Sequence, residues 1–423
     1  MERSLGSLAL AGLPAWFARE AFAADEEAAA LRRTPGPNDR LVMGAIGTGS
    51  RGMDILKEAR KRGAQFVAVC DVDSSHRANA VKELKGQVAE YGDFRELLEH
   101  PDIEAVTIVV PDHWHALIAI AAMKKAKDIY CEKPLTLTVA EGQAMVKVAA
   151  ATKPIFQTGS QQRSDRRFRL ACELVRNGRL GQLKTIETRI GDNPKEGPFP
   201  VAPVPKELDW NFWLGQTPEV EYVTKRCHYE FRWWYEYSGG KVTDWGAHHN
   251  DIAQWGLGTD DTGPVEVVSE CDQPLQEPNC YNCPPHFKIT YTYANGVKLI
   301  CRDDGENGVK FEGEQGWIFV SRGKIEASDK KLIDEPLPAD AVRLYDSNDH
   351  MRNFFDCVRD RKPTICPVEV GFRSVTVCHI GNISMRLGGK HLKWDPAKER
   401  FEGDTLANQM LSRQMRAPWK LEV

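Results

Sequence analysis

The segment LVMGAIGTGSRG, residues 41–52, constrains the fold more than any other part of the chain. A short apolar strand leads into Gly47, Gly49 and Gly52, a GxGxxG pattern that opens an expected helix at 50–62. Glycine permits the tight turn and lets backbone N–H groups approach a pyrophosphate closely. The positive N-terminal end of the helix would face the same anion. The pattern predicts a dinucleotide-binding turn, and a glycine-rich turn that binds nothing is the alternative.

An acidic residue stands at the expected distance after this turn. A second strand at 65–70 ends at Asp71, which lies 24 residues past Gly47. An acid in this place accepts hydrogen bonds from the adenosine ribose hydroxyls of a dinucleotide. Because its carboxylate would repel a 2′-phosphate, NAD is favoured over NADP as the cofactor, and the nearby Arg77 weakens that preference.

Between residues 40 and 159 the apolar pattern alternates between strands and helices. This alternation predicts an α/β Rossmann domain, with a parallel sheet covered by helices on both faces. The expected strands lie at 42–46, 65–70, 104–110, 127–131 and 154–158, and the expected helices at 50–62, 75–88, 93–99, 115–126 and 138–151.

Residues 160–423 are predicted to form a second domain, of α+β type, that binds the substrate. The turn Ala294-Asn295-Gly296 joins two of its strands as a hairpin. An open, mostly antiparallel sheet leaves one face without helices, so we expect a homo-oligomer formed through that face. The expected strands lie at 183–191, 265–271, 286–294, 297–303, 308–313 and 316–321.

Residues 1–39 have the pattern of a signal segment followed by a polar linker at 24–39. A basic start and an apolar stretch at 5–17 precede Ala21-Phe22-Ala23, an A-x-A cleavage sequence. The segment resembles the later part of a twin-arginine signal, but only Arg3 stands where a pair of arginines is needed. An exported, periplasmic protein is therefore expected, with a cytoplasmic one as the alternative.

Composition argues against several classes of partner. The net charge of −4 gives no reason to expect nucleic acid or an anionic membrane surface as a partner. No apolar run in the sequence reaches the roughly 20 residues that span a bilayer. His113 and His115 lack a third ligand nearby, and Cys280 and Cys283 form a CxxC without a second pair, so no metal site is predicted.

Two strand ends carry residues suited to chemistry. The strand at 104–110 runs into PDHWH at 111–115, at the carboxyl end of the sheet, where such folds bind ligands. The strand at 127–131 ends in CEKPL, where Lys133 can hydrogen-bond a substrate hydroxyl and offset alkoxide charge. A surface Glu-Lys pair is the alternative. The residues expected to contact the cofactor are Gly47, Gly49, Ser50, Arg51, Gly52, Asp71, Pro111, His115, Glu132 and Lys133.

A second candidate site lies in the expected helix at 243–255. Asp244 and His248 are four residues apart, so both side chains share one face of that helix. A carboxylate that fixes the tautomer of an imidazole is the usual arrangement for a general base. Asp251 is near the same face and could also orient His248. A capping aspartate with a packed histidine is the alternative.

The motifs MGAIGTGSRG, PDHWH, CEKPL and GGKVTDWGAHHND, in this order and with Asp71 between the first two, resemble the Gfo/Idh/MocA oxidoreductases. The resemblance covers nearly all of the chain after residue 40. It implies that Lys133 is the catalytic lysine of the EKP motif, and that Asp244 and His248 are the family's DxxxH pair. Whether Lys133 or His248 is the direct base stays open.

The resemblance and the residues together predict an NAD(P)-dependent oxidoreductase. Its substrate would be a sugar, glycoside or polyol hydroxyl, oxidised by hydride transfer to nicotinamide. The alternative is an NAD-dependent glycosidase that oxidises a ring carbon transiently, eliminates the aglycone and re-reduces the sugar with the bound cofactor. A non-catalytic sensor is disfavoured, because it has no need of a proton-transfer set. The residues expected to contact the sugar are Gln161, Arg163, Arg232, Tyr235 and His248, with one or two of the six tryptophans between 210 and 255.

Overall fold

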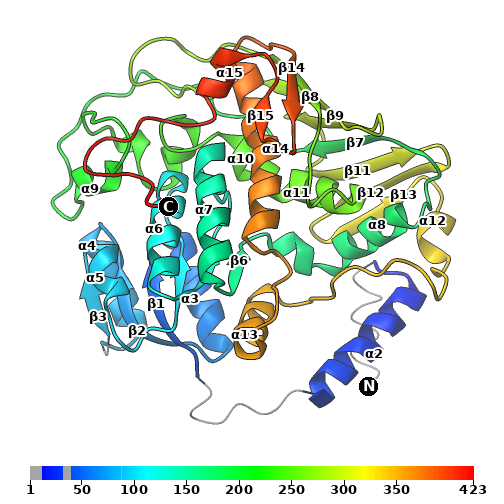
Figure 1. Cartoon of the computed structure of the whole chain (residues 1–423), viewed down its shortest axis with the longest axis horizontal. Coiled ribbons are helices and arrows are strands. Elements are labelled where there is room, and N and C mark those ends of the chain that lie inside the picture. Colours follow the sequence, from blue (N-terminus) through cyan, green and yellow to red (C-terminus); the bar gives the residue numbers. More distant parts are fainter. Residues whose placement is uncertain (1–11, 32–39, 87) are drawn as a thin grey trace.

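The protein folds into two domains, each built around one sheet (Figure 1). The structure is a computed structural model, and it describes residues 12–31, 40–86 and 88–423. The first domain lies at the lower left of Figure 1, and the second extends from the right across the top, with α14 (Val368–Arg386) running between the two sheets.

The first sheet is parallel throughout, with the strand order β3-β2-β1-β4-β5-β6. This arrangement confirms the predicted Rossmann domain. The strands are β1 (Val42–Ile46), β2 (Gln65–Cys70), β3 (Ala89–Tyr91), β4 (Ala105–Ile108), β5 (Asp128–Cys131) and β6 (Phe156–Thr158). The helices are α3 (Ser50–Lys61), α4 (Ser74–Glu83), α5 (Phe94–Leu98), α6 (Asp112–Lys124) and α7 (Val139–Thr152).

One predicted helix of this domain is too long. The helix expected at 75–88 ends at Glu83, and the edge strand β3 follows. Three residues are too few to show the alternation by which a strand is recognised in a sequence. The central strands β4 and β5 are buried along their whole length, as expected where helices cover both faces of a sheet.

The second sheet has nine strands in the order β13-β12-β11-β7-β10-β9-β8-β14-β15. Only β7 and β10 pair in parallel, which confirms the predicted mostly antiparallel sheet. The strands are β7 (Leu183–Arg189), β8 (Glu266–Cys271), β9 (Phe287–Thr292), β10 (Lys298–Arg302), β11 (Gly308–Gly313), β12 (Gly316–Ser321), β13 (Lys324–Ala327), β14 (Leu392–Asp395) and β15 (Arg400–Phe401).

Helices cover one face of this sheet. Along β7, Ile186 and Thr188 are buried, whereas Glu187 and Arg189 are half-buried on the other face. The long helices are α8 (Arg166–Arg176), α11 (Gly246–Leu257), α13 (His350–Asp360) and α14 (Val368–Arg386). The short ones are η1 (Gln161–Ser164), α9 (Trp210–Leu214), η2 (Thr224–Arg226), η3 (His228–Trp233), α10 (Lys241–Asp244), α12 (Lys331–Asp334) and α15 (Thr405–Gln409).

Two late helices join the domains. Met351 and Phe354 of α13 are buried in the same apolar cluster as Met43 and Ala45 of β1. Helix α14 contacts α7 of the first domain and β8 of the second. The chain therefore returns to the Rossmann domain after residue 350, and this fixes the position of one sheet relative to the other.

The expected linker at 24–39 is partly wrong, because helix α2 (Ala15–Leu31) continues through its first eight residues. Phe17, Ala18 and Ala21 of α2 are each only 1% exposed. Trp16 Nε1 donates to the Ile333 carbonyl at 2.9 Å, which holds the helix to the second domain. The expected cleavage point after Ala23 therefore lies inside a packed helix. Residues 1–11 of the expected signal and 32–39 of the expected linker lie outside the described residues.

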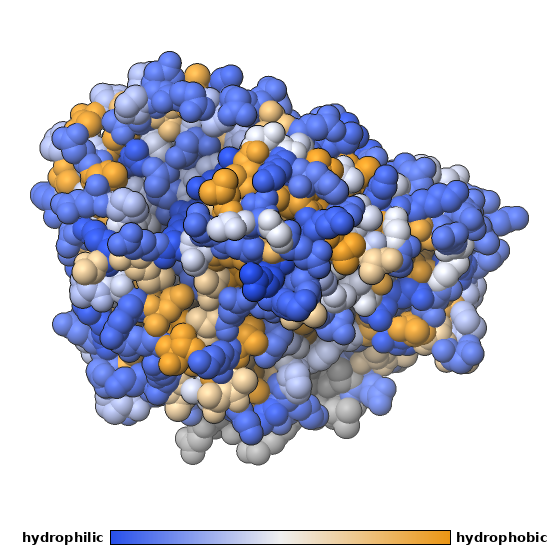
Figure 2. Space-filling model, turned by 45° about the horizontal axis from the view of Figure 1, so that its top comes forward, coloured by the Kyte–Doolittle hydropathy of each residue, from blue (hydrophilic) through white to orange (hydrophobic). Residues whose placement is uncertain are grey.

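The face drawn in Figure 2 is mostly hydrophilic, with apolar residues scattered in small groups. Such a mixture is ordinary for a surface in contact with water. In the part of the chain that the structure describes, no helix combines the length and the apolar character that crossing a membrane requires.

Phe17→Ala is expected to loosen α2, because it removes a ring that is buried and lies beneath the guanidinium of Arg169, with the Cζ atom 5.0 Å from the ring centroid. Core Phe→Ala changes cost about 3–5 kcal/mol. Limited proteolysis should cleave this variant within α2 faster than the wild-type protein. The matched control is Phe22→Ala in the same helix, because Phe22 is only half-buried. Equal cleavage rates for the two variants would contradict the packing of α2.

Candidate active site

A cavity of about 1010 Å³ lies where the two domains meet. The first domain lines it with the glycine turn and with residues that follow β2, β4 and β5, and the second domain contributes from η1, η3, α10 and α11. The predicted residues on its wall are Gly47, Gly49, Ser50, Arg51, Gly52, Asp71, Pro111, Glu132, Lys133, Gln161, Arg232, Asp244 and His248. The structure therefore brings together most of the residues that the sequence singled out.

Each of the three glycines of the turn is required, or permitted, by different steric surroundings. Gly47 has a φ of 82°, and a Cβ there would lie 2.1 Å from the Val109 carbonyl oxygen. A Cβ on Gly52 would lie 2.2 Å from the Gly47 carbonyl oxygen. A Cβ on Gly49 would have its nearest neighbour 3.5 Å away, on the His76 ring. Gly49 therefore has open space beside it, and it borders the cavity. The first and third glycines thus permit close packing, and the second leaves room for a ligand.

The helix that follows the turn is suited to bind an anion. Gly49 is the N-cap residue of α3 and offers no side-chain oxygen to the N–H groups of the first turn. Those groups and the helix dipole therefore favour an anionic ligand at this end of the cavity. The backbone fits the pyrophosphate of a dinucleotide.

Asp71 follows β2 on the same wall. Its Oδ2 atom accepts a hydrogen bond from Thr48 N at 2.8 Å, and its Oδ1 atom accepts one from Asp73 N at 3.0 Å. His76 Nδ1 lies 3.4 Å from Oδ2, and this hydrogen bond raises the pKa of His76. Arg77 donates to the backbone carbonyl of Asp71. The carboxylate is thus held rigidly at the position expected for a ribose contact.

Glu132 organises the middle of the cavity. Its Oε1 atom accepts from Arg51 Nη2 at 3.0 Å and from Gln161 Nε2 at 2.7 Å. Burial lowers the pKa of Arg51, and the negative charge of Glu132 raises it. The net result is a raised pKa of Arg51. A Cβ on Gly159 would lie 2.8 Å from Glu132 Oε2, so glycine at 159 makes room for this carboxylate. Glu132 therefore fixes Arg51 and Gln161 on the wall.

Lys133 crosses from the first domain to the second. Its Nζ atom donates to Asp244 Oδ1 at 2.7 Å and to the Asp244 backbone carbonyl at 2.9 Å. Burial opposes ionisation of Asp244, but Lys133 and Arg232 outweigh it and lower the pKa of Asp244 to about 2. Lys133 and Asp244 therefore form a charged pair at neutral pH.

The single helix expected at 243–255 is interrupted at Trp245, between α10 and α11. In a continuous helix the Asp244 carbonyl would accept from His248 N–H. Here Lys133 takes that carbonyl, and His248 N–H bonds to the Trp245 carbonyl at 3.0 Å instead. The lysine of one domain is thus bonded to the backbone of the other where its helix is interrupted.

The predicted pairing of Asp244 with His248 is wrong. Asp244 bonds to Lys133, and among the described residues His248 Nδ1 is buried without a hydrogen-bond partner. Burial, followed by the positive charges of Lys133 and Arg322, lowers the pKa of His248 well below its usual value. His248 is therefore neutral near pH 7 and can accept a proton from a group in the cavity.

Arg163 and Asp251 form a structural pair away from the cavity. Arg163 is 2% exposed, and its Nε and Nη2 atoms donate to Asp251 at 2.8 Å. Asp260 accepts from the same guanidinium. The expectations that Arg163 contacts the sugar and that Asp251 orients His248 are therefore corrected: the two charges satisfy each other inside the second domain.

Two further predicted residues do not reach the cavity. His115 Nδ1 lies 2.7 Å from the Pro134 carbonyl, so its ring supports the lysine loop from behind. Burial lowers the pKa of His115 to about 4, which leaves it neutral. The hydroxyl of Tyr235 donates to Asn382 Oδ1 at 3.4 Å, and Tyr235 lies on other surface hollows.

Several wall residues were missed from the sequence. Arg322 comes from the turn between β12 and β13, and Tyr229 from η3. His76 and His228 lie near Asp71, and Asp112 lies in the first turn of α6. Only Asp112 carried a sequence signal, because it stands in the PDHWH motif next to Pro111, which was predicted to contact the cofactor. The others lie in α4, in η3 and in the turn between β12 and β13, and none of them stands in a recognisable ligand-binding motif.

The parallel sheet, the glycine turn and the α+β domain define a nucleotide-binding Rossmann protein with a second domain. Two family models match the chain. "Oxidoreductase family, NAD-binding Rossmann fold" covers residues 41–160, and "Oxidoreductase family, C-terminal alpha/beta domain" covers residues 195–421. The protein therefore belongs to the Gfo/Idh/MocA oxidoreductase family.

A curated relative is an inositol 2-dehydrogenase of Pseudomonas savastanoi pv. phaseolicola. It is 30% identical over 182 residues, which are 41% of this chain and 54% of the relative. The chain thus spans about half the length of the curated relatives it matches.

Solved structures share the fold over most of the chain. An aldose-aldose oxidoreductase from Caulobacter crescentus, complexed with glycerol, is 17% identical with a TM-score of 0.63, over 84% of this chain and 99% of that one. The WlbA dehydrogenase from Bordetella pertussis, in complex with NADH and UDP-GlcNAcA, is 15% identical with a TM-score of 0.65, over 84% and 99%. At these identities the likeness shows the fold alone.

Asp112→Asn is expected to change how stability depends on pH. Burial raises the pKa of Asp112 to about 7, although the hydrogen bond from Ser238 lowers it. An unfolded aspartate ionises near pH 4, so between pH 4 and 7 the unfolding free energy of the wild-type protein falls as pH rises. Asparagine does not titrate. The variant should therefore gain about 2 kcal/mol relative to wild type between pH 5 and pH 8.

Urea denaturation of both proteins at the two pH values measures this difference. Asp102→Asn, at an exposed aspartate, is the matched control and should leave the pH dependence unchanged. A stability difference between Asp112→Asn and wild type that stays constant with pH would show that Asp112 is ionised throughout.

Proposed function

We propose that this protein is an NAD-dependent oxidoreductase that acts on a hydroxyl group of a sugar or polyol. The observation that carries the proposal is the convergence of the glycine turn, Lys133, Asp244 and His248 on one cavity. The family and the inositol 2-dehydrogenase relative support it. A bound nicotinamide would supply the hydride acceptor.

The chain's own residues have separable roles in this reaction. His248 is neutral, and its Nδ1 atom is buried, so Nε2 is the nitrogen that would take the substrate hydroxyl proton. The Lys133 ammonium would offset the alkoxide charge that develops as the proton leaves. Asp244 is a positioning residue, because it holds the Lys133 Nζ atom. The pairing of Lys133 with Asp244 favours His248 as the direct base.

The walls around this set suit a polyhydroxylated substrate. Trp213 and Trp245 line the cavity beside Tyr229, and flat rings bind the apolar faces of sugar rings. Arg232, which lies 3.4 Å from Asp244 Oδ1, and Gln161 offer N–H donors on the same wall. We propose that these side chains contact the substrate hydroxyls.

The cofactor preference, the assembly and the compartment are part of the same proposal. Asp71 supports NAD over NADP, because its carboxylate borders the ribose position. The half-buried face of β7 in the second sheet supports a homo-oligomer formed through that face. The sequence at the N-terminus supports export, and the burial of Phe17 and Ala21 supports a form that keeps α2.

Lys133→Ala should lower kcat by at least about 100-fold, because one donor to a developing oxyanion contributes that much. The dissociation constant for NAD should change little, since the glycine turn and Asp71 are untouched. Steady-state assays over a panel of sugars and inositols, with fluorescence titration of NADH, measure both. Lys124→Ala, at a side chain 40% exposed on α6, is the matched control. A near wild-type kcat for Lys133→Ala would remove the lysine from the mechanism.

The same panel should include aryl glycosides. Stoichiometric formation of NADH supports net oxidation. Release of the aryl group without NADH would contradict it and select the glycosidase reaction.

Asp71→Ser should raise the affinity for NADP relative to NAD, because it removes a negative charge from the ribose position. The ratio of the two dissociation constants is the measurement, since loss of the Thr48 contact lowers both affinities together. A ratio equal to that of wild type would place cofactor selection elsewhere.

A further inference from the structure

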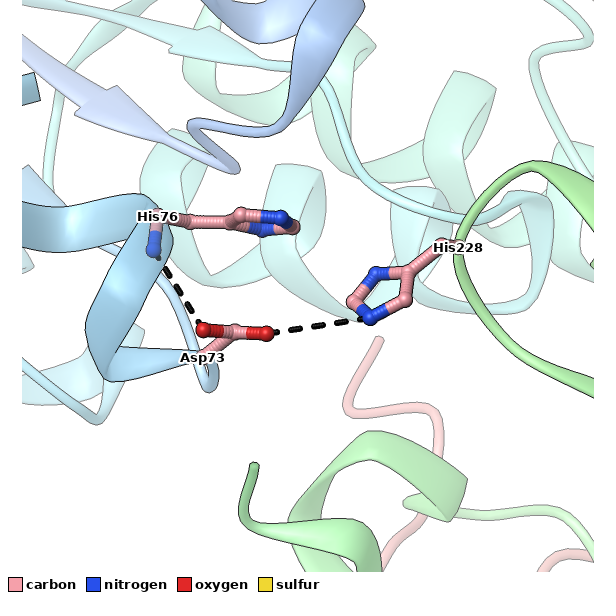
Figure 3. Close-up of side chains that lie close together, drawn as sticks. All are labelled: Asp73, His76 and His228. Carbon is pink, nitrogen blue, oxygen red and sulfur yellow. Dashed lines mark hydrogen bonds and ion pairs between the residues drawn. The ribbon is translucent and has the colours of Figure 1, made fainter. Parts of the chain in front are cut away.

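We propose that Asp73, His76 and His228 form a binding site for one divalent transition-metal ion of the zinc class, at the rim of the cavity (Figure 3). Asp73 caps α4, His76 lies in the first turn of α4, and His228 begins η3 in the second domain. One ligand atom of each residue lies within 4.8 Å of the other two.

One oxygen of the Asp73 carboxylate faces the other candidate ligands. Its Oδ1 atom accepts from Ser75 N at 2.8 Å and from His76 N at 3.3 Å, as the cap of α4. Its Oδ2 atom points toward His228, with Nε2 at 3.7 Å (Figure 3). The helix cap therefore fixes the carboxylate and leaves Oδ2 facing the second domain.

His76 is held as metal-binding histidines usually are. Its Nδ1 atom lies 3.4 Å from Asp71 Oδ2, which leaves Nε2 as the ligand atom. A metal-binding imidazole almost always gives its other nitrogen to a carboxylate, carbonyl or water, and this contact fixes the ring and its tautomer. Asp71 would serve as that outer partner.

The donor set selects the kind of metal. Two imidazole nitrogens and one carboxylate oxygen suit zinc, whereas calcium and magnesium prefer oxygen ligands alone. Zinc bonds of about 2.0–2.1 Å require the ligand atoms to move closer together. The side chain of His228 is 45% exposed and has room to make that movement. Three protein ligands leave a coordination position for water.

A metal here would join the domains at the rim of the cavity, because two ligands come from α4 and one from η3. The inference stands apart from the proposed function, since metal binding is measured without turnover. The sequence analysis predicted no metal site from the histidine and cysteine motifs, and His228 belongs to neither because it lies far from the other two ligands along the chain.

Titration with Zn²⁺ tests the site directly. The full chain, stripped of metal with a chelator, should take up about one ion per chain from a chromophoric chelator. His228→Gln and His76→Gln should each weaken this binding at least about tenfold. His286→Gln is the matched control, because His286 is an exposed histidine with a single carboxylate partner, Asp303 at 2.7 Å. It should keep the wild-type affinity.

Thermal unfolding gives a second readout. Zn²⁺ should raise the Tm of the wild-type protein and of His286→Gln, but not that of His228→Gln, because only a ligand bound to the native state stabilises it. Equal zinc affinities for wild type and His228→Gln would overturn the proposal, and so would the absence of binding to wild type. Zinc held by the cysteine thiols would give the first of these results.

Discussion

The active-site geometry of this protein depends on one interaction, the contact of Lys133 with Asp244. A single ammonium group bonds both the carboxylate and the backbone carbonyl of a residue in the other domain. The carboxylate bond lowers the pKa of Asp244, although burial alone would raise it. The carbonyl bond lies next to the break between α10 and α11 at Trp245, where His248 N–H bonds to the Trp245 carbonyl. Removing the lysine would therefore alter shape and charge together.

The cavity holds one side chain that is stabilised in its charged form, Asp244, and one that is stabilised in its neutral form, His248. Asp244 is stabilised as an anion by Lys133 and Arg232, whereas the same lysine helps to keep His248 neutral. A proton-accepting imidazole thus lies beside a fixed cation, which is the combination that a hydroxyl group needs to lose a proton. Because the Lys133 charge acts on both Asp244 and His248, the protonation states of these two residues depend on each other.

The sequence was sufficient for the Rossmann domain because its signals are local. Strands alternate with helices, and glycine at 52 is required by a contact with the Gly47 carbonyl within the same turn. The sequence was insufficient where the hydrogen-bond partner of a side chain lies far away along the chain. Asp244 bonds to a lysine 111 residues away rather than to the histidine four residues on, and Arg163 is neutralised by an aspartate 88 residues away. Helical spacing places side chains on a face, but it does not say which of several partners they choose.

Contacts between the domains occur at both ends of the cavity. Lys133 and Asp244 meet at the catalytic end. At the other end Asp73 forms a β-bridge with Leu208, and Ser74 N donates to the Glu207 carbonyl at 2.8 Å. Opening either end would break the contacts at that end, which are backbone hydrogen bonds or a buried charge pair. The cavity is therefore closed by contacts between the domains at both ends, and Tyr229 and His228 are among its wall residues that are exposed to water.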